Sequence, residues 1–192
     1  MTHLQFLTSA ITSGDYARAE AAAQGVAALG ADAIPALLDL LASPDTDSRW
    51  WAVRTLAAIS DPQIPSRLRE ALHDPDPAVR QCAALGLSQQ PDSKSIPDLI
   101  AALNDDDRLT ARLAADALGA IGADAVPALL EIMKNGLHPA RLEAARTLAV
   151  IGDHRSIPTL LDALDGDSAL IEYWAEQGLE RIGVGMTFFK PE

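Results

Sequence analysis

The chain is 192 residues long, with 15 basic and 27 acidic residues that give a formal net charge of −12. This acidic balance argues against a broad nucleic-acid interface and against binding to anionic membranes, and the 4% aromatic content with few β-branched runs argues against a β-sandwich or barrel. A single cysteine, no apolar run near the roughly 18 residues of a membrane span, and no signal-peptide pattern in residues 1–14 lead us to expect a cytoplasmic protein without nucleic-acid or membrane partners.

The N-terminal segment, residues 1–33, predicts a pair of helices. Leu4, Leu7 and Ile11 fall on one side of a first helix, and Ala22-Ala23 marks a second. This segment has no Ile-Pro or Val-Pro pair, unlike the motifs that follow it. An atypical unit at one end suits a repeat array, because its outer side must face water.

The rest of the chain repeats one motif, which starts with an Ile-Pro or Val-Pro pair every 30 to 32 residues. The pairs are Ile34-Pro35, Ile64-Pro65, Ile96-Pro97, Val126-Pro127 and Ile157-Pro158. Apolar residues follow at the third, fourth and seventh positions, as in Leu37, Leu38 and Leu41, and this spacing predicts one side of an α-helix. Proline suits the first turn of that helix, where an N–H group would have no partner. The second motif is weaker because Arg67 takes an apolar place.

Each motif then predicts a second helix, which follows an Asp-rich break such as Asp74-Pro75-Asp76. The second helices share a pair of small residues with a leucine three residues later: Ala52-Val53 with Leu56, Ala83-Ala84 with Leu87, Ala114-Ala115 with Leu118, Ala144-Ala145 with Leu148, and Ala175-Glu176 with Leu179. We therefore predict one continuous all-α domain over residues 1–185, an α-solenoid of six helical hairpins followed by a tail at 186–192. Its units are expected at about 1–33, 34–63, 64–95, 96–125, 126–156 and 157–185.

Two stretches carry a family resemblance. Val79-Arg80 with Ala83-Ala84 and Ile96-Pro97, and residues 114–122 with Val126-Pro127, resemble HEAT-like repeats of the phycobilisome-lyase type. The resemblance covers nearly the whole chain and implies a right-handed superhelix whose second helices line a concave groove. The resemblance is compatible with several activities. Most members of the family are binding scaffolds, some attach bilins to phycobiliproteins, some resemble deoxyhypusine hydroxylase, and a related branch binds damaged DNA.

The candidate binding residues lie on the second helices and are expected to face outward into this groove. The outward positions are the residue two places before the small pair and the residues four and eight places after that one, and a candidate occupies one of these positions or the position next to it. They are Trp50, Arg54, Arg112, Arg146, Tyr173, Trp174 and Arg181. Trp and Arg are the residues that most often anchor protein interfaces. The expected partner is a protein or peptide segment with carboxylates and apolar side chains, held by Arg side chains and aromatic surfaces.

Structural roles are expected for Trp174 and for other Trp and Arg residues of the second helices. Trp51 and Trp174 are expected to pack between adjacent second helices. Arg49, Arg80 and Arg141 share one repeat position near the interhelical aspartates, so we expect a ladder of Asp–Arg contacts between motifs.

No catalytic or metal-binding set emerges from the sequence. None of the four histidines is followed by glutamate, the pair that iron hydroxylases of this kind use, so no metal is expected. Cys82 has no histidine placed to activate it and is expected to be a partly buried thiol.

We therefore expect a non-enzymatic protein-interaction scaffold without a cofactor. The alternative is a bilin lyase-like or tetrapyrrole-handling factor, and an iron hydroxylase is disfavoured. The tail, with Phe188 and Phe189, is expected either to cover the last repeat or to mediate weak self-association.

Overall fold

The computed structural model describes residues 2–166 and 168–184, and these residues form helices and turns without a β-strand. The chain divides into two compact units, Met1–Gln90 and Pro91–Glu192. The predicted all-α fold of helical hairpins is confirmed. The single continuous array over residues 1–185 stays a prediction, and the tail at 186–192 lies outside the described residues.

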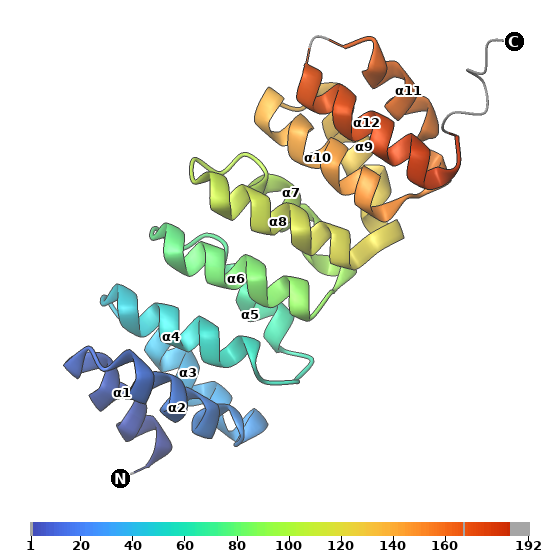
Figure 1. Ribbon diagram of the computed structural model, residues 1–192. Coiled ribbons are helices and arrows are strands. Elements are labelled where there is room, and N and C mark those ends of the chain that lie inside the picture. The colour runs from blue at the N-terminus through green and yellow to red at the C-terminus, as the bar shows by residue number, and fades with distance from the viewer. Residues whose placement is uncertain (1, 167, 185–192) are drawn as a thin grey trace, which may run out of the picture. The chain divides into compact units, whose positions relative to one another are not determined.

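The first unit contains three helical hairpins. Its helices are α1 (His3–Ser13), α2 (Tyr16–Ala27), α3 (Ile34–Leu41), α4 (Thr46–Ala57), α5 (Ile64–Ala71) and α6 (Pro77–Gln89), with a 3₁₀ turn at Gly30–Ala33. Each odd-numbered helix packs against the even-numbered helix that follows it, and α4 contacts both α2 and α6. In Figure 1, α3 and α5 lie behind α4 and α6, so the second helices of the hairpins form one layer of this unit.

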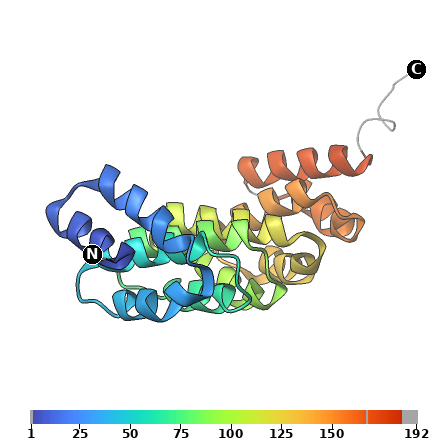
Figure 2. The same ribbon diagram turned by 90° about the horizontal axis from the view of Figure 1, so that it is seen from below.

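The second unit repeats the same arrangement. Its helices are α7 (Ile96–Ala102), α8 (Arg108–Ile121), α9 (Val126–Asn135), α10 (His138–Ile151), α11 (Ile157–Leu164) and α12 (Ala169–Ile182), with 3₁₀ turns at Ser93–Ser95, Gly122–Ala125 and His154–Ser156. Here α10 contacts α8 and α12, while α7, α9 and α11 pack against α8, α10 and α12. The two layers of helices in each unit can be followed in the turned view of Figure 2.

Local sequence signals explain where the helices begin. Proline stands in the first turn of α3, α5, α7, α9 and α11, as the Ile-Pro and Val-Pro pairs predict. Most second helices begin after a residue whose side chain accepts a hydrogen bond from the first turn: Asp15 in α2, Asp45 in α4, Asp76 in α6, Asp107 in α8 and Ser168 in α12. The exception is α10, where Leu137 occupies this position and no side chain caps the helix.

The core of each unit lies between its two layers of helices. The leucines that follow the small pairs, such as Leu56, Leu87 and Leu118, are buried. The small residues let the helices come close: a Cβ added at Gly86 would lie 2.9 Å from side-chain carbons of both Ala57 and Leu68. Burial of the apolar side of every helix against its neighbours therefore stabilises each unit.

One stretch, Arg108–Asn135, is long and apolar enough by composition to cross a membrane, with a mean hydropathy of 1.5 in its best window. In the structure this stretch is two helices, α8 and α9, separated by the 3₁₀ turn that starts at Gly122, whose φ is +77°. Both helices pack within the second unit, so packing against neighbouring helices accounts for their apolar residues.

Candidate functional site

The structure differs from the sequence prediction in how far the candidate binding residues reach solvent. Arg112, Tyr173 and Arg181 are exposed, Trp50, Arg54 and Trp174 are half-buried, and Arg146 is buried. Whether these residues bind a partner remains a prediction. Trp50 and Arg54 belong to the first unit and the others to the second.

Arg146 was expected to face outward but lies between two acidic side chains. Its Nη2 donates to Asp116 Oδ1 on α8 at 2.7 Å, and its Nε donates to Glu143 Oε2 on α10 at 2.9 Å. Nη2 also reaches the carbonyl oxygen of Arg112 at 3.3 Å. The Arg146 side chain is only 9% exposed, so its guanidinium links α8 to α10 and is already occupied.

Arg54 occupies the equivalent repeat position in the first unit, with a different outcome. Its Nη2 lies 2.8 Å from Oε1 of Glu20 on α2, but the two side chains are 41% and 36% exposed. Arg54 also lies close enough to Cys82 to act on its charge, yet burial outweighs this and raises the pKa of the Cys82 thiol to about 12. Cys82 therefore stays protonated at neutral pH and is not a nucleophile in this structure.

Two aromatic pairs stand at matching positions of α4 and α12. The rings of Trp50 and Trp51 meet edge to face with centroids 4.9 Å apart, and those of Tyr173 and Trp174 do so at 5.2 Å. Trp51 is buried, as its expected packing role requires. In the second pair, Tyr173 is 49% exposed and presents an apolar ring with a polar hydroxyl to solvent.

The expected Asp–Arg ladder exists between the second and third hairpins. Arg49 donates from Nε and Nη2 to both carboxylate oxygens of Asp74, at 2.8 and 3.0 Å, and Arg49 Nη1 donates to the carbonyls of Ser43 and Pro44. Arg80 makes main-chain contacts like those of Arg49, because its Nη1 donates to the carbonyls of Asp74 and Pro75. Burial of Asp74 opposes its ionisation, but the hydrogen bonds from Arg49 and from the main chain of Asp76, together with the charges of Arg49 and Arg80, outweigh this and lower the pKa of the Asp74 carboxyl. Arg49 therefore has a structural role, and the role expected for Arg141 stays a prediction.

A hollow of about 310 Å³ is lined by residues of α10 and α12, which are second helices of neighbouring hairpins. It is lined by Ala149, Val150, Trp174, Gln177, Glu180 and Arg181. The Arg181 side chain lies against Gly152, where an added Cβ would come within 3.4 Å of the Arg181 Cδ atom. We call this the aromatic hollow; it combines the predicted residues Trp174 and Arg181 with two further polar side chains.

A larger hollow, of about 530 Å³, lies where α8, α10 and α12 begin. Its walls combine Leu103, Leu137, Leu142 and Leu170 with Asp105, Asp106, Glu143, Arg108 and His138. Leu137 is 70% exposed and Leu170 is 59% exposed, so two leucines of the same hollow leave most of their apolar surface in contact with water. We call this the leucine hollow, and the sequence analysis missed it.

A signal for the leucine hollow was nevertheless present in the sequence. Leu137 stands directly before a second helix, at the place that aspartate takes in the preceding motifs. Losing a capping side chain weakens a helix by about 1 kcal/mol, so an exposed leucine at this place is a local exception that points to function.

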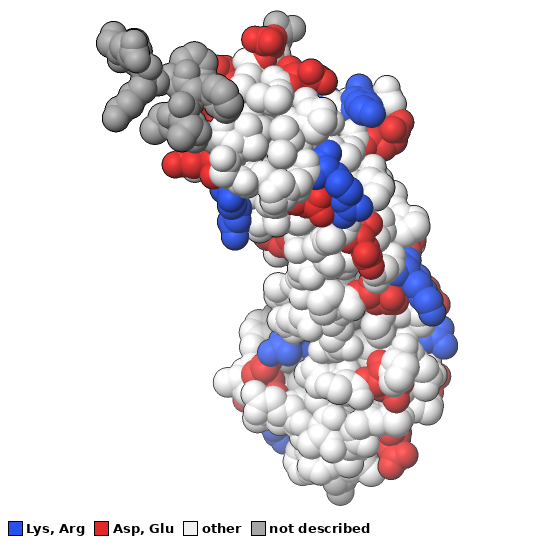
Figure 3. Space-filling view, turned by 90° about the vertical axis from the view of Figure 1, so that its right-hand side faces the viewer, with Lys and Arg blue, Asp and Glu red and all other residues white. Residues whose placement is uncertain are grey.

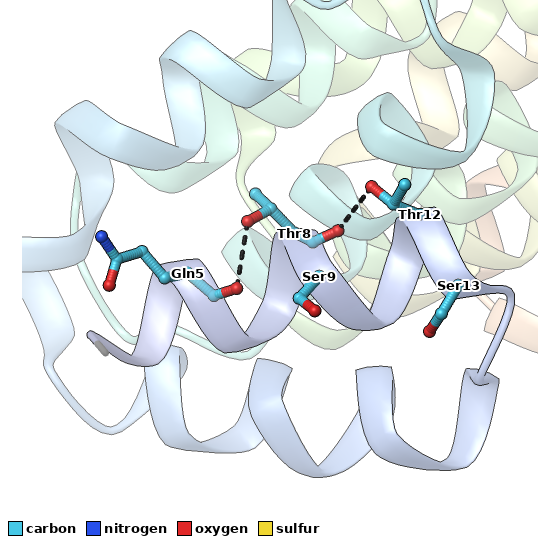
Figure 4. A pocket seen from close by; sticks show the side chains of 5 residues that line it. All are labelled: Gln5, Thr8, Ser9, Thr12 and Ser13. Carbon is cyan, nitrogen blue, oxygen red and sulfur yellow. Dashed lines mark hydrogen bonds between the residues drawn. The ribbon is translucent and has the colours of Figure 1, made fainter.

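The other surfaces formed by the described residues offer fewer groups that could bind a ligand. A shallow hollow of about 720 Å³ along α1 is lined by Gln5, Thr8, Ser9, Thr12 and Ser13, and Figure 4 shows that two of its hydroxyls bond to the main chain of α1 itself. On the face shown in Figure 3, acidic and basic side chains are interspersed, without a broad basic patch. Within residues 2–166 and 168–184, no group of three His, Cys, Asp or Glu is placed to hold a metal ion.

The HEAT repeat family model matches the chain three times, over residues 4–88, 34–119 and 96–180. The chain is 31% identical over 161 residues to the uncharacterized phycocyanin operon protein Z of Pseudanabaena tenuis, with 79% of each chain covered. It is 36% identical over 95 residues to a phycocyanobilin lyase subunit beta of Nostoc, covering 50% of this chain and 46% of that protein. The chain thus spans about half the length of this lyase relative.

Among solved structures, the complex of CpcE and CpcF of phycocyanin lyase from Nostoc superposes with a TM-score of 0.56, at 23% identity, covering 73% of this chain and 96% of the matched chain. This likeness concerns the fold. The expectation that the protein is not an enzyme is nevertheless wrong, because a relative at 36% identity is a subunit of a lyase, whereas the expected role in protein interaction is consistent with the HEAT-repeat fold. That expectation rested on a search for catalytic residues within one chain, whereas the matched relative is one subunit of a lyase.

Proposed function

The chain is a HEAT-repeat protein of the phycobilisome-lyase type, and from this we propose that it is a subunit of a bilin lyase-type enzyme that holds an open-chain tetrapyrrole and works together with a second protein. The observation that carries the proposal is the 36% identity over 95 residues to a phycocyanobilin lyase subunit beta, which stands beside the similarity to a phycocyanin operon protein over 79% of both chains. A protein with several subunits divides its tasks, so this chain need not contain the reacting groups.

The chemistry of the second unit supports pigment handling. An open-chain tetrapyrrole is a long conjugated apolar molecule that also carries ring N–H donors and two propionate carboxylates. A site for it therefore needs apolar area, acceptors for the N–H groups and cationic or N–H donors for the propionates. Leucines, carboxylates, arginines and a histidine occur together on the second-helix side of this unit.

We assign no covalent step to this chain. Its one cysteine, Cys82, is buried, and its pKa of about 12 keeps the thiol protonated. The proposed role is to bind and orient the pigment, while the group to which the pigment becomes attached belongs to another protein.

A protein partner is the second part of the proposal. The relatives include a lyase subunit, and the related solved structure is a complex of two proteins. Exposed or half-buried Trp, Tyr and Arg side chains on the second helices suit such contacts, and we propose Trp50, Arg54, Arg112, Tyr173, Trp174 and Arg181 for them. Arg146 is left out because its guanidinium is taken up by Asp116 and Glu143.

Titration of the purified full-length protein with phycocyanobilin, followed by visible absorbance, tests the pigment part of the proposal. We expect a saturable spectral change with one pigment per chain, because a bound pigment is held in one conformation and removed from water. The same chain unfolded in urea is the control and should give no saturation. A spectrum that remains that of free pigment at protein concentrations above 100 μM, about the weakest useful affinity for such a role, would contradict the proposal.

A further inference from the structure

We propose that the leucine hollow, rather than the aromatic hollow, is where the second unit holds the pigment; this inference rests on the proposed function and identifies its site. Both hollows fall within the range of small-molecule sites, but the leucine hollow, with about 530 Å³, is larger than the aromatic hollow, with about 310 Å³, and so offers more room for a long pigment. The ligand class is an open-chain tetrapyrrole with free propionates.

Two exposed leucines provide apolar surface at the leucine hollow. Leu137 and Leu170 come from different motifs, lie on the same hollow and are 70% and 59% exposed. Below them, Leu103 and Ala111 are buried and form an apolar floor. A planar pigment placed here would cover apolar area that now faces water, and this is the main source of affinity for such ligands.

The polar part concerns groups of both signs on the rim. Arg108 and His138 line the hollow and are exposed, and they are donors for propionate carboxylates. Asp106, which is exposed, supplies an acceptor for ring N–H groups. The donors and acceptors of the rim thus complement those of an open-chain tetrapyrrole.

The exception at Leu137 makes the inference testable in two directions at once. Serine at 137 can accept a hydrogen bond from the first turn of α10, as Ser168 does in α12. Leu137→Ser should therefore raise the melting temperature by about 2–4 °C. The same change removes an apolar wall of the hollow, so it should weaken pigment binding. A variant that is more stable and yet binds less cannot be explained by misfolding.

The experiment compares phycocyanobilin titrations of full-length variants. Leu137→Ser with Leu170→Ser tests the leucine hollow, Gln177→Ala tests the aromatic hollow, and Leu161→Ser is the matched control, since Leu161 is an exposed leucine of α11 outside both hollows. We expect the double variant to lose at least about tenfold in affinity while the other two stay within about twofold of the unmodified protein.

The remaining outcomes separate the inference from the function on which it rests. Binding that survives the double variant but falls in Gln177→Ala would overturn the leucine hollow and leave the proposed function standing. Absence of binding by every variant and by the unmodified protein would overturn both. Sedimentation of the same proteins tests another occupant: a dimer of the unmodified chain that the double variant breaks, with pigment binding unchanged, would show that a second copy covers these leucines and would also overturn the inference.

Discussion

Replacing Arg146 by methionine is expected to destabilise the second unit by about 2–3 kcal/mol. The change keeps the aliphatic stem but removes charge-assisted hydrogen bonds to Asp116 at 2.7 Å and to Glu143 at 2.9 Å. Each such bond contributes about 1.5–3 kcal/mol when buried. The Asp116 side chain is 46% exposed and regains water, so its share is small. The loss comes mainly from Glu143, which is 17% exposed and is left with Arg112 at 3.8 Å.

Arg54→Met is the matched control for this prediction. It removes an ion pair of similar length, 2.8 Å, at the equivalent repeat position, but between side chains that are 41% and 36% exposed. Its expected effect is below about 1 kcal/mol, because water and salt screen exposed pairs. The assay is urea unfolding followed by far-ultraviolet circular dichroism at 25 °C. Equal losses for the two variants, or a loss below about 0.5 kcal/mol for Arg146→Met, would refute the reasoning that burial decides the contribution of this repeat position.

Three further predictions concern the first unit. Gly86→Ala places a Cβ 2.9 Å from side-chain carbons of both α4 and α5, so it should lower the free energy of unfolding by about 1–3 kcal/mol in urea, and an unchanged midpoint would contradict the close approach. Cys82, with its pKa raised to about 12, should react with a thiol reagent at pH 8 only after urea unfolds the chain; rapid labelling of the folded protein would contradict its burial. Because the pKa of Asp74 is lowered in the fold, its contribution is present above the unfolded value and is lost as pH falls below about 4; the stability gap between the unmodified protein and Asp74→Asn should therefore shrink from pH 6 to pH 3, and a gap that widens would contradict the pairing with Arg49.

The differences between prediction and structure have one physical origin. Arg54 and Arg146 stand at the same repeat position, and the spacing of their helices gives both an outward direction. Their burial differs because the neighbouring helix supplies one nearby carboxylate to Arg54, whereas Arg146 has Asp116 on that helix and Glu143 on its own. A periodic pattern describes one helix at a time and does not say what the next helix places beside it.

The prediction that the protein is not an enzyme was wrong for a related reason, whereas its bilin lyase-like alternative is supported by the relatives. A search for catalytic residues within the chain finds none, yet a relative is a lyase subunit, and a subunit can contribute binding rather than reacting groups. The leucine hollow was missed because its walls come from three motifs and combine only when α8, α10 and α12 lie side by side. Each leucine alone looks like an ordinary surface residue.

The amino-acid sequence by itself determined the helices, their pairing into hairpins and the repeat. Proline in the first turn, aspartate before the second helix and apolar residues three and four positions apart act over a few residues, so they can be recognised without knowing the neighbours. Only the tertiary structure decided which side chains of the second helices remain in contact with water. Desolvation and the shape of a hollow depend on atoms contributed by other helices, and no single motif contains that information.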